Sequence, residues 1–179
     1  MLRRVNDYAD RLVAKLLPES ITQTLIRAGC FLSAYELIKS EVVDSTHEFV
    51  AFDFGDGKCD EARYQQDVLS RDPSRYRASC AWLVDMGGLT TAQATALEDI
   101  HVHRHEIAHE LPKLLVDPDF EIKTDLLLAA VDCLRSLGVF WVRMTADIDQ
   151  NVADEDIKSG SYALMEHVLM IAGFDPEAI

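Results

Sequence analysis

Basic residues are scarce in this sequence. It has 17 Lys and Arg against 31 Asp and Glu, which gives a formal net charge of −14. Affinity for nucleic-acid backbones comes from Lys and Arg side chains that neutralise phosphates. The composition therefore argues against a general nucleic-acid binder, and we expect no DNA partner. Any contact with nucleic acid must be local.

Long apolar runs are absent too. No uncharged apolar stretch reaches the roughly 18 residues that a membrane span requires, so we expect no membrane association. Charges also interrupt residues 1–11, where a secretory signal would need an apolar core.

The cysteines lack any Cys-x-x-Cys spacing, so we expect reduced thiols in a cytoplasmic protein, three of them in the core. They are Cys30, Cys59, Cys80 and Cys133.

The composition that is present is typical of a globular protein, since 49% of the 179 residues are hydrophobic and 8% are aromatic. This length favours one domain over residues 1–179. Apolar residues recur at helical spacing, which predicts an all-α bundle of about five to six helices. We expect helices over about 3–17, 20–44, 75–85, 91–112, 120–145 and 154–172. Turn formers at 52–73 predict an inserted loop, and its acidic residues lack the order of an EF-hand.

Two signals bound the helix over 91–112. The run from Thr90 to Gln93 matches a capping box, so the helix should begin at Thr91. Pro112 should end or kink it. Trp82 and Trp141 are expected in the core, and His47 and His103 on the surface.

The chemically richest segment lies in this helix, from His101 to His109, and holds four of the six histidines. His105, Glu106 and His109 match the His-Glu-x-x-His pattern of zinc peptidases, in which two histidines four apart grip one ion. A third ligand is needed, and His101 would stretch the set over about 12 Å of straight helix. The other candidates are Glu121, Asp125 and Asp132. No substrate-aligning strand is predicted upstream, so a zinc hydrolase remains a third hypothesis.

A second motif overlaps the first, with Arg104, a polar residue at His105, and His109 five positions after the arginine. It resembles the signature of the HEPN superfamily of all-helical domains, which is Arg, four to six residues, then His. The likeness extends in outline to a long early helix that carries Tyr35 and Glu36, and to a later helix that ends near Arg143.

The resemblance implies a HEPN-like bundle and a metal-independent endoribonuclease of a toxin–antitoxin or antiviral defence type. It implies a homodimer whose motif helices face each other, an RNA substrate, no cofactor, and an antitoxin or other regulatory protein as partner. Arg104 would stabilise the phosphate, His109 would act as general acid or base, and His105 would support them. Glu36 or Lys39 would complete the network. Leu111 replaces the tyrosine that is modified in one branch, which weighs against that form of regulation.

The residues suit this chemistry. An imidazole with a pKa near 6.5 can take a proton from a ribose 2′-hydroxyl, and a guanidinium can hold a phosphate by two hydrogen bonds. Positions five apart lie about 140° apart around a helix, so Arg104 and His109 do not share a face. Two alternatives stay open: a HEPN-like domain that only binds a partner, and a purely structural helix whose histidines face solvent.

Overall fold

The computed structural model describes residues 2–52, 59–146 and 152–174. These residues form helices joined by short connections, and the only strand-like feature among them is one isolated bridge between Phe52 and Cys59. The predicted all-α class is confirmed. In chain order the elements are α1 (Leu2–Lys15), α2 (Pro18–Lys39), η1 (Ser40–Asp44), α3 (Ser45–Ala51), α4 (Glu61–Asp67), η2 (Leu69–Arg71), α5 (Arg75–Asp85), α6 (Thr91–Val116), α7 (Thr124–Thr145), η3 (Asp154–Asp156) and α8 (Gly160–Ala172).

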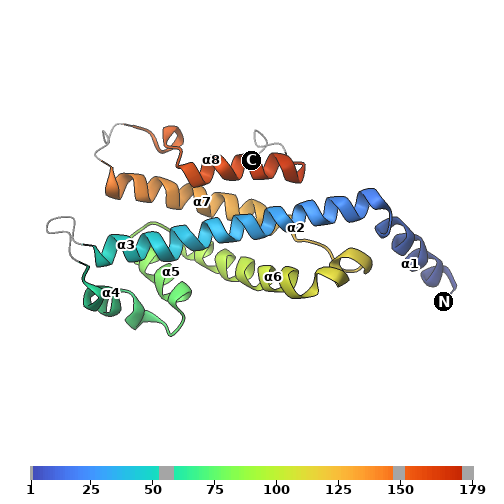
Figure 1. Ribbon diagram of the computed structural model, residues 1–179, viewed down its shortest axis with the longest axis horizontal. Helices are drawn as coiled ribbons and strands as arrows, with labels where there is room; N and C mark the ends of the chain where they lie inside the picture. The colour runs from blue at the N-terminus through green and yellow to red at the C-terminus, as the bar shows by residue number, and fades with distance from the viewer. Residues whose placement is uncertain (1, 53–58, 147–151, 175–179) are drawn as a thin grey trace.

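The long second helix is the axis of the molecule. Figure 1 shows α2 running through the middle, with α7 and α8 on one side and α5 and α6 on the other, while α1 forms one end. Pro18 occupies the first helical position, where its missing N–H is not needed. The helix continues beyond the predicted end near 44, through a π-helical turn at 40–44 and into α3.

The π-helical turn has a packing partner on α7. The indole Nε1 of Trp141 donates a hydrogen bond to the carbonyl oxygen of Glu41 at 3.1 Å. A π-helical turn leaves a carbonyl less tightly engaged than an α-helix does, which frees it for such an external donor. This contact anchors α7 to the long helix.

The core lies where α2 meets α6, α7 and α8. Its largest fully buried apolar side chains include Phe31, Ile38, Leu97, Ile100, Ile107, Leu127, Leu134, Leu137, Met165 and Leu169. Trp82 and Trp141 are buried as predicted, with stacked rings 6.3 Å apart. Three of the four cysteines are buried, as predicted: they are Cys30, Cys80 and Cys133, whereas Cys59 is exposed. Burial raises the pKa of both Cys80 and Cys133 to about 12, so these thiols are uncharged.

The predicted loop at 52–73 is wrong in part, because it contains α4 and η2. The Asp60 side chain accepts a hydrogen bond from the backbone N–H of Arg63 and so caps α4. Tyr64 and Val68, four residues apart, are both buried and hold the segment against the bundle. His47 contributes to this packing, with its ring 4.7 Å from that of Tyr64. Residues 53–58 of the predicted loop lie outside the described residues.

The other boundaries follow local capping. The helix over 75–85 and the capping box at Thr90 are confirmed. The predicted helix over 120–145 begins at Thr124 instead, because the backbone of Lys123 adopts an extended conformation and donates its N–H to a side chain of α6. The predicted helix over 154–172 is divided into η3 and α8. Gly173 ends α8 in the left-handed conformation, with φ of +88°. Among the described residues, no helix is both long and apolar enough to cross a bilayer.

Candidate functional site

The motif helix α6 carries the candidate site in its second half. Its backbone is helical up to Glu110, which has φ of −114° and ψ of 19°, and it resumes through Pro112. Pro112 has no N–H to give to the carbonyl of Ala108, and its ring crowds that carbonyl. The predicted kink is therefore present, one residue after His109.

His103 is a core residue, which corrects the prediction that it lies on the surface. It is 1% exposed and packs edge-on against Phe31, with ring centroids 5.0 Å apart. Its Nε2 accepts a hydrogen bond from the backbone N–H of Lys123 at 3.0 Å. The proton therefore lies on Nδ1, which donates to the Glu106 carboxylate at 2.7 Å. This hydrogen bond is the main cause that lowers the pKa of Glu106, and the charge of Lys123 adds to it. His103 thus joins α6 to the start of α7.

Arg104 lies against α2. Its Cζ is 5.2 Å from the centroid of the Tyr35 ring, which is a cation–π contact. Its terminal nitrogen donates to Glu36 Oε1 at 3.3 Å, and Lys39 Nζ lies 3.6 Å from the same carboxylate. Its Nε is buried without a hydrogen-bond partner among the described residues. Glu36 and Lys39 therefore do form a network with Arg104.

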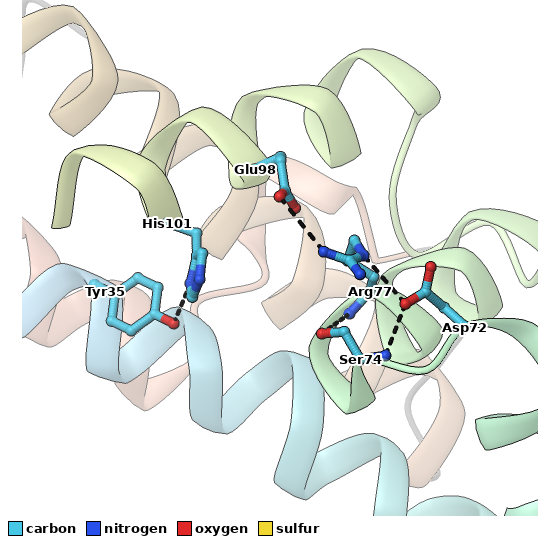
Figure 2. A network of polar contacts seen from close by, with 6 residues as sticks. All are labelled: Tyr35, Asp72, Ser74, Arg77, Glu98 and His101. Atoms are coloured by element: carbon cyan, nitrogen blue, oxygen red, sulfur yellow. Dashed lines mark hydrogen bonds and ion pairs between the residues drawn. The ribbon is translucent and has the colours of Figure 1, made fainter. Parts of the chain in front are cut away.

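His101 shares Tyr35 with Arg104. Figure 2 shows the Tyr35 hydroxyl directed at the His101 ring, and the distance from Oη to Nδ1 is 2.7 Å. The ring of Tyr76 stacks on His101 with centroids 5.6 Å apart and planes 26° apart. Burial raises the pKa of Tyr35, and the positive charge of Arg104 opposes that rise. The phenol therefore stays protonated at neutral pH, and which of the two groups donates depends on the tautomer of His101.

The start of α5 is tied to α6 beside this cluster. Arg77 Nε donates to Asp72 at 3.1 Å, and its Nη1 lies 3.9 Å from Glu98 on α6. Figure 2 shows this ion-pair network next to His101, with Ser74 at the N-terminus of α5. These contacts hold the start of α5, and with it the Tyr76 ring, in place against the motif helix.

His105 and His109 lie on another side of α6. Both are exposed, and their rings are 4.3 Å apart because positions four apart are neighbours on a helix. Val102, His105, His109 and Pro112 are all exposed and follow one another at intervals of three, four and three residues. This is the spacing of a helix that packs against another helix. We call these four residues the exposed seam.

The structure therefore divides the predicted site residues into two groups. His105 and His109 are together on the exposed seam, whereas Arg104 belongs to the cluster of Tyr35, Glu36 and His101. No hydrogen bond or ion pair joins Arg104 to His109 among the described residues. Within one chain, the described contacts therefore hold Arg104 and His109 in different surroundings.

The residues of the zinc motif are not arranged around a common point. Glu106 is held by His103, and Asp132 accepts from Gln93 Nε2 at 2.8 Å, in the first turn of α6. That turn is about 24 Å along the helix from His109. Glu121 lines a small hollow with Lys15 and Arg27 instead. In the part of the chain that the structure describes, no three His, Cys, Asp or Glu side chains are placed to hold a metal ion.

A larger hollow lies at the opposite end of α6. It has a volume of about 610 Å³ and is lined by the turn between α5 and α6 and by one side of α7, with Gly88, Gln93, Arg135 and Phe140 among its residues. A Cβ on Gly88 would lie 2.9 Å from the Phe140 ring, so the narrow glycine lets this turn approach α7. None of the motif residues lines this hollow.

Sequence reasoning placed His101 only in the metal motif and did not link it to Arg104. One available signal was the spacing of three between His101 and Arg104, which puts them about 60° apart on one side of the helix. The partner, Tyr35, is 66 residues away from His101, and no local pattern indicates such a pairing. Comparisons of the chain with protein-family models, with curated proteins and with solved structures found no match.

Proposed function

We propose that this chain is a metal-independent endoribonuclease of the HEPN type, which acts in the cytoplasm as a homodimer. The observation that carries the proposal is the exposure of the motif histidines on a seam with helix-packing spacing, while Arg104 is fixed against α2. If two α6 helices pack through their seams in antiparallel fashion, His109 of one protomer approaches the Arg104 side of the other.

The reaction that such a pair supports is an attack of the ribose 2′-hydroxyl on the adjacent phosphorus. A neutral His109 takes the proton of the hydroxyl, and the new bond from 2′-oxygen to phosphorus displaces the 5′-oxygen, which is protonated by an imidazolium of the site. Arg104 stabilises the negative charge that grows on the phosphate oxygens. His105, next to His109, supports the exchange of protons.

The charge of −14 restricts where RNA can bind. Two copies of Arg104 and four seam histidines at one interface would form a local positive region in an acidic dimer. Because few cations contact the backbone, binding should be weak and sensitive to salt. A basic regulatory protein, such as an antitoxin, would suit the remaining acidic surface, and the toxin or effector arm of a defence system would be the biological role.

One observation favours a second candidate, a non-catalytic HEPN-like binding module. Arg104 is already paired with Glu36 at 3.3 Å, and it lies apart from His109 within the chain. An arginine in a permanent ion pair contributes to stability rather than to substrate binding. The distance is long for a charge-assisted bond, for which about 2.7–2.9 Å is usual, so a phosphate can compete for the guanidinium.

Cleavage of RNA in the presence of EDTA tests the proposal. We expect the wild type to cut RNA, and both Arg104→Ala and His109→Ala to lose activity by at least about a hundredfold. The matched control is His167→Ala, which removes an exposed histidine from α8. Intact RNA with a folded wild-type dimer would leave only the binding module. Expression in growing cells provides a second readout, since a ribonuclease toxin should arrest growth in the wild type but not in His109→Ala.

A further inference from the structure

We propose that His101 and Arg104 together form a phosphate-binding pair, ordered by Tyr35, that holds the phosphodiester of an RNA strand. Tyr35 contacts both residues, with its hydroxyl on His101 and its ring under Arg104. This inference rests on the proposed function for its substrate, but it assigns a residue outside the Arg–His signature to the site.

The hydrogen bond from Tyr35 decides which nitrogen of His101 carries the proton. His101 Nδ1 is the one hydrogen-bond partner of the Tyr35 hydroxyl among the described residues, so the phenol proton has an acceptor there only if Nδ1 is unprotonated. The neutral imidazole then carries its proton on Nε2. His101 is exposed, and no described residue forms a hydrogen bond with its Nε2. The stacked ring of Tyr76 restricts rotation of the imidazole. His101 therefore presents one oriented N–H donor that the protein itself does not use.

Arg104 supplies the second donor. Its guanidinium has five N–H groups, and only the contact with Glu36 uses one of them among the described residues. Glu36 is 53% exposed and is also close to Lys39, so this carboxylate has another cation to pair with when a phosphate takes its place. The Tyr35 ring keeps the guanidinium in position during that exchange.

The charges around the pair differ from those of the whole chain. Two separate ion-pair networks lie on α2, α5 and α6, and their charges balance: they are Lys39, Arg77 and Arg104 against Glu36, Asp72 and Glu98. The chain as a whole carries −14. An anion that approaches this patch of α2, α5 and α6 therefore meets less repulsion than the average surface would produce.

The test uses binding of a probe that cannot be cleaved. A short, fluorescently labelled 2′-O-methyl oligouridylate has no free 2′-hydroxyl, so its affinity for the full-length protein reports phosphate binding alone. His101→Asn leaves an amide near Nδ1 for Tyr35 but has no donor at Nε2, whereas His101→Gln returns a donor near that position. His167→Asn, on α8, is the matched control.

We expect His101→Asn to raise Kd at least about tenfold, since a hydrogen bond to a charged phosphate is lost. His101→Gln should recover most of the affinity, and His167→Asn should leave it unchanged. Tyr35→Phe keeps the ring under Arg104 but removes the hydroxyl. In this variant, nitrogen NMR of the His101 ring should change from a single Nε2–H tautomer to a mixture, and Kd should rise by a smaller factor.

Equal affinities of the wild type and His101→Asn, no binding of the probe by the wild type, or a wild-type His101 protonated on Nδ1 would each overturn the inference. Its failure can be told apart from failure of the proposed function. Probe binding that depends on His101, without any cleavage of RNA, would refute the ribonuclease and retain the phosphate site. Cleavage that depends on Arg104 and His109 but not on His101 would refute the phosphate site and retain the ribonuclease.

Discussion

His103 is buried where α6 meets α2 and the start of α7, although His101 and His105 on either side of it are exposed. Both ring nitrogens are used, one on the Glu106 carboxylate and the other on the backbone N–H of Lys123. A buried backbone N–H without a partner is costly, so the ring serves as the cap that the first turn of α7 would otherwise lack.

Replacement of this ring should destabilise the fold without touching the exposed motif residues. We expect His103→Ala to lower the free energy of unfolding by about 2–4 kcal/mol, since it leaves a cavity beside Phe31 and an unpaired N–H on Lys123. Urea denaturation measures the effect. His105→Ala, an exposed neighbour, should change stability by less than about 0.5 kcal/mol. Equal losses in the two variants would contradict the structural role of His103.

The carboxylate of Glu106 should make part of the stability depend on pH. Its pKa is lowered in the folded protein from the ordinary value of 4.5, so its contribution is present above that pH and is lost as pH falls through the folded-state value. Wild type should therefore lose more stability than Glu106→Gln between about pH 5 and pH 3. Denaturation midpoints across this range provide the measurement, and parallel curves for the two proteins would count against the His103–Glu106 hydrogen bond.

At the scale of the elements, a glycine of α7 allows a close approach of the residue that begins α8. A Cβ on Gly138 would lie 2.5 Å from Oγ and 2.8 Å from Cβ of Ser159. Ser159 is the N-cap of α8, and its hydroxyl accepts from the backbone N–H of Tyr162 at 3.2 Å. The glycine therefore sets both the spacing of the two helices and the start of α8.

Two glycine replacements should thus change stability in opposite directions. Gly138→Ala should cost about 1–3 kcal/mol, because it displaces the capping serine. Gly29→Ala, on α2 with no atom within 4 Å of the added Cβ, should stabilise the protein by about 0.5–1 kcal/mol. Thermal or urea unfolding of both variants decides the matter, and a neutral Gly138→Ala would mean that α7 and α8 are not in such close contact.

The sequence predicted the boundaries of helices correctly where residues close to the boundary determine them. The capping box at Thr90 and the kink at Pro112 each depend on residues within one turn of the boundary, and each is present. The early start predicted for α7 was wrong because a side chain of α6 binds the N–H of Lys123. The helix at 61–67 was missed because the turn formers around it hid the buried pair of Tyr64 and Val68.

For the candidate site too, features with a local cause could be predicted from the sequence and features with a distant cause could not. The separation of Arg104 from His109 around the helix, and the position of His105 beside His109, were predictable from a period of 3.6 residues. The burial of His103 and the link from His101 to Tyr35 were not, because they depend on which side of α6 meets α2 and α7. Periodicity in a segment with histidine at 101, 103, 105 and 109 does not identify that side.

At the scale of the whole molecule, the proposed ribonuclease requires a dimer that forms through the exposed seam. Val102→Asp should weaken self-association at least about tenfold, because it places a charge where the seam would otherwise bury an apolar side chain against the partner helix. The matched control is Leu164→Asp on α8, since Val102 is 50% exposed and Leu164 is 53% exposed. Analytical ultracentrifugation gives the association constants. A wild-type monomer, or equal weakening by both variants, would rule out the seam as the interface.

Complementation between two inactive variants tests whether one active site takes Arg104 from one protomer and His109 from the other. Arg104→Ala and His109→Ala are refolded together and assayed for RNA cleavage in EDTA. We expect the mixture to recover about a quarter of the wild-type rate, because half of the dimers are mixed and each mixed dimer holds one intact site of two. A mixture as inactive as either variant alone, although mixed dimers have formed, would contradict the shared site.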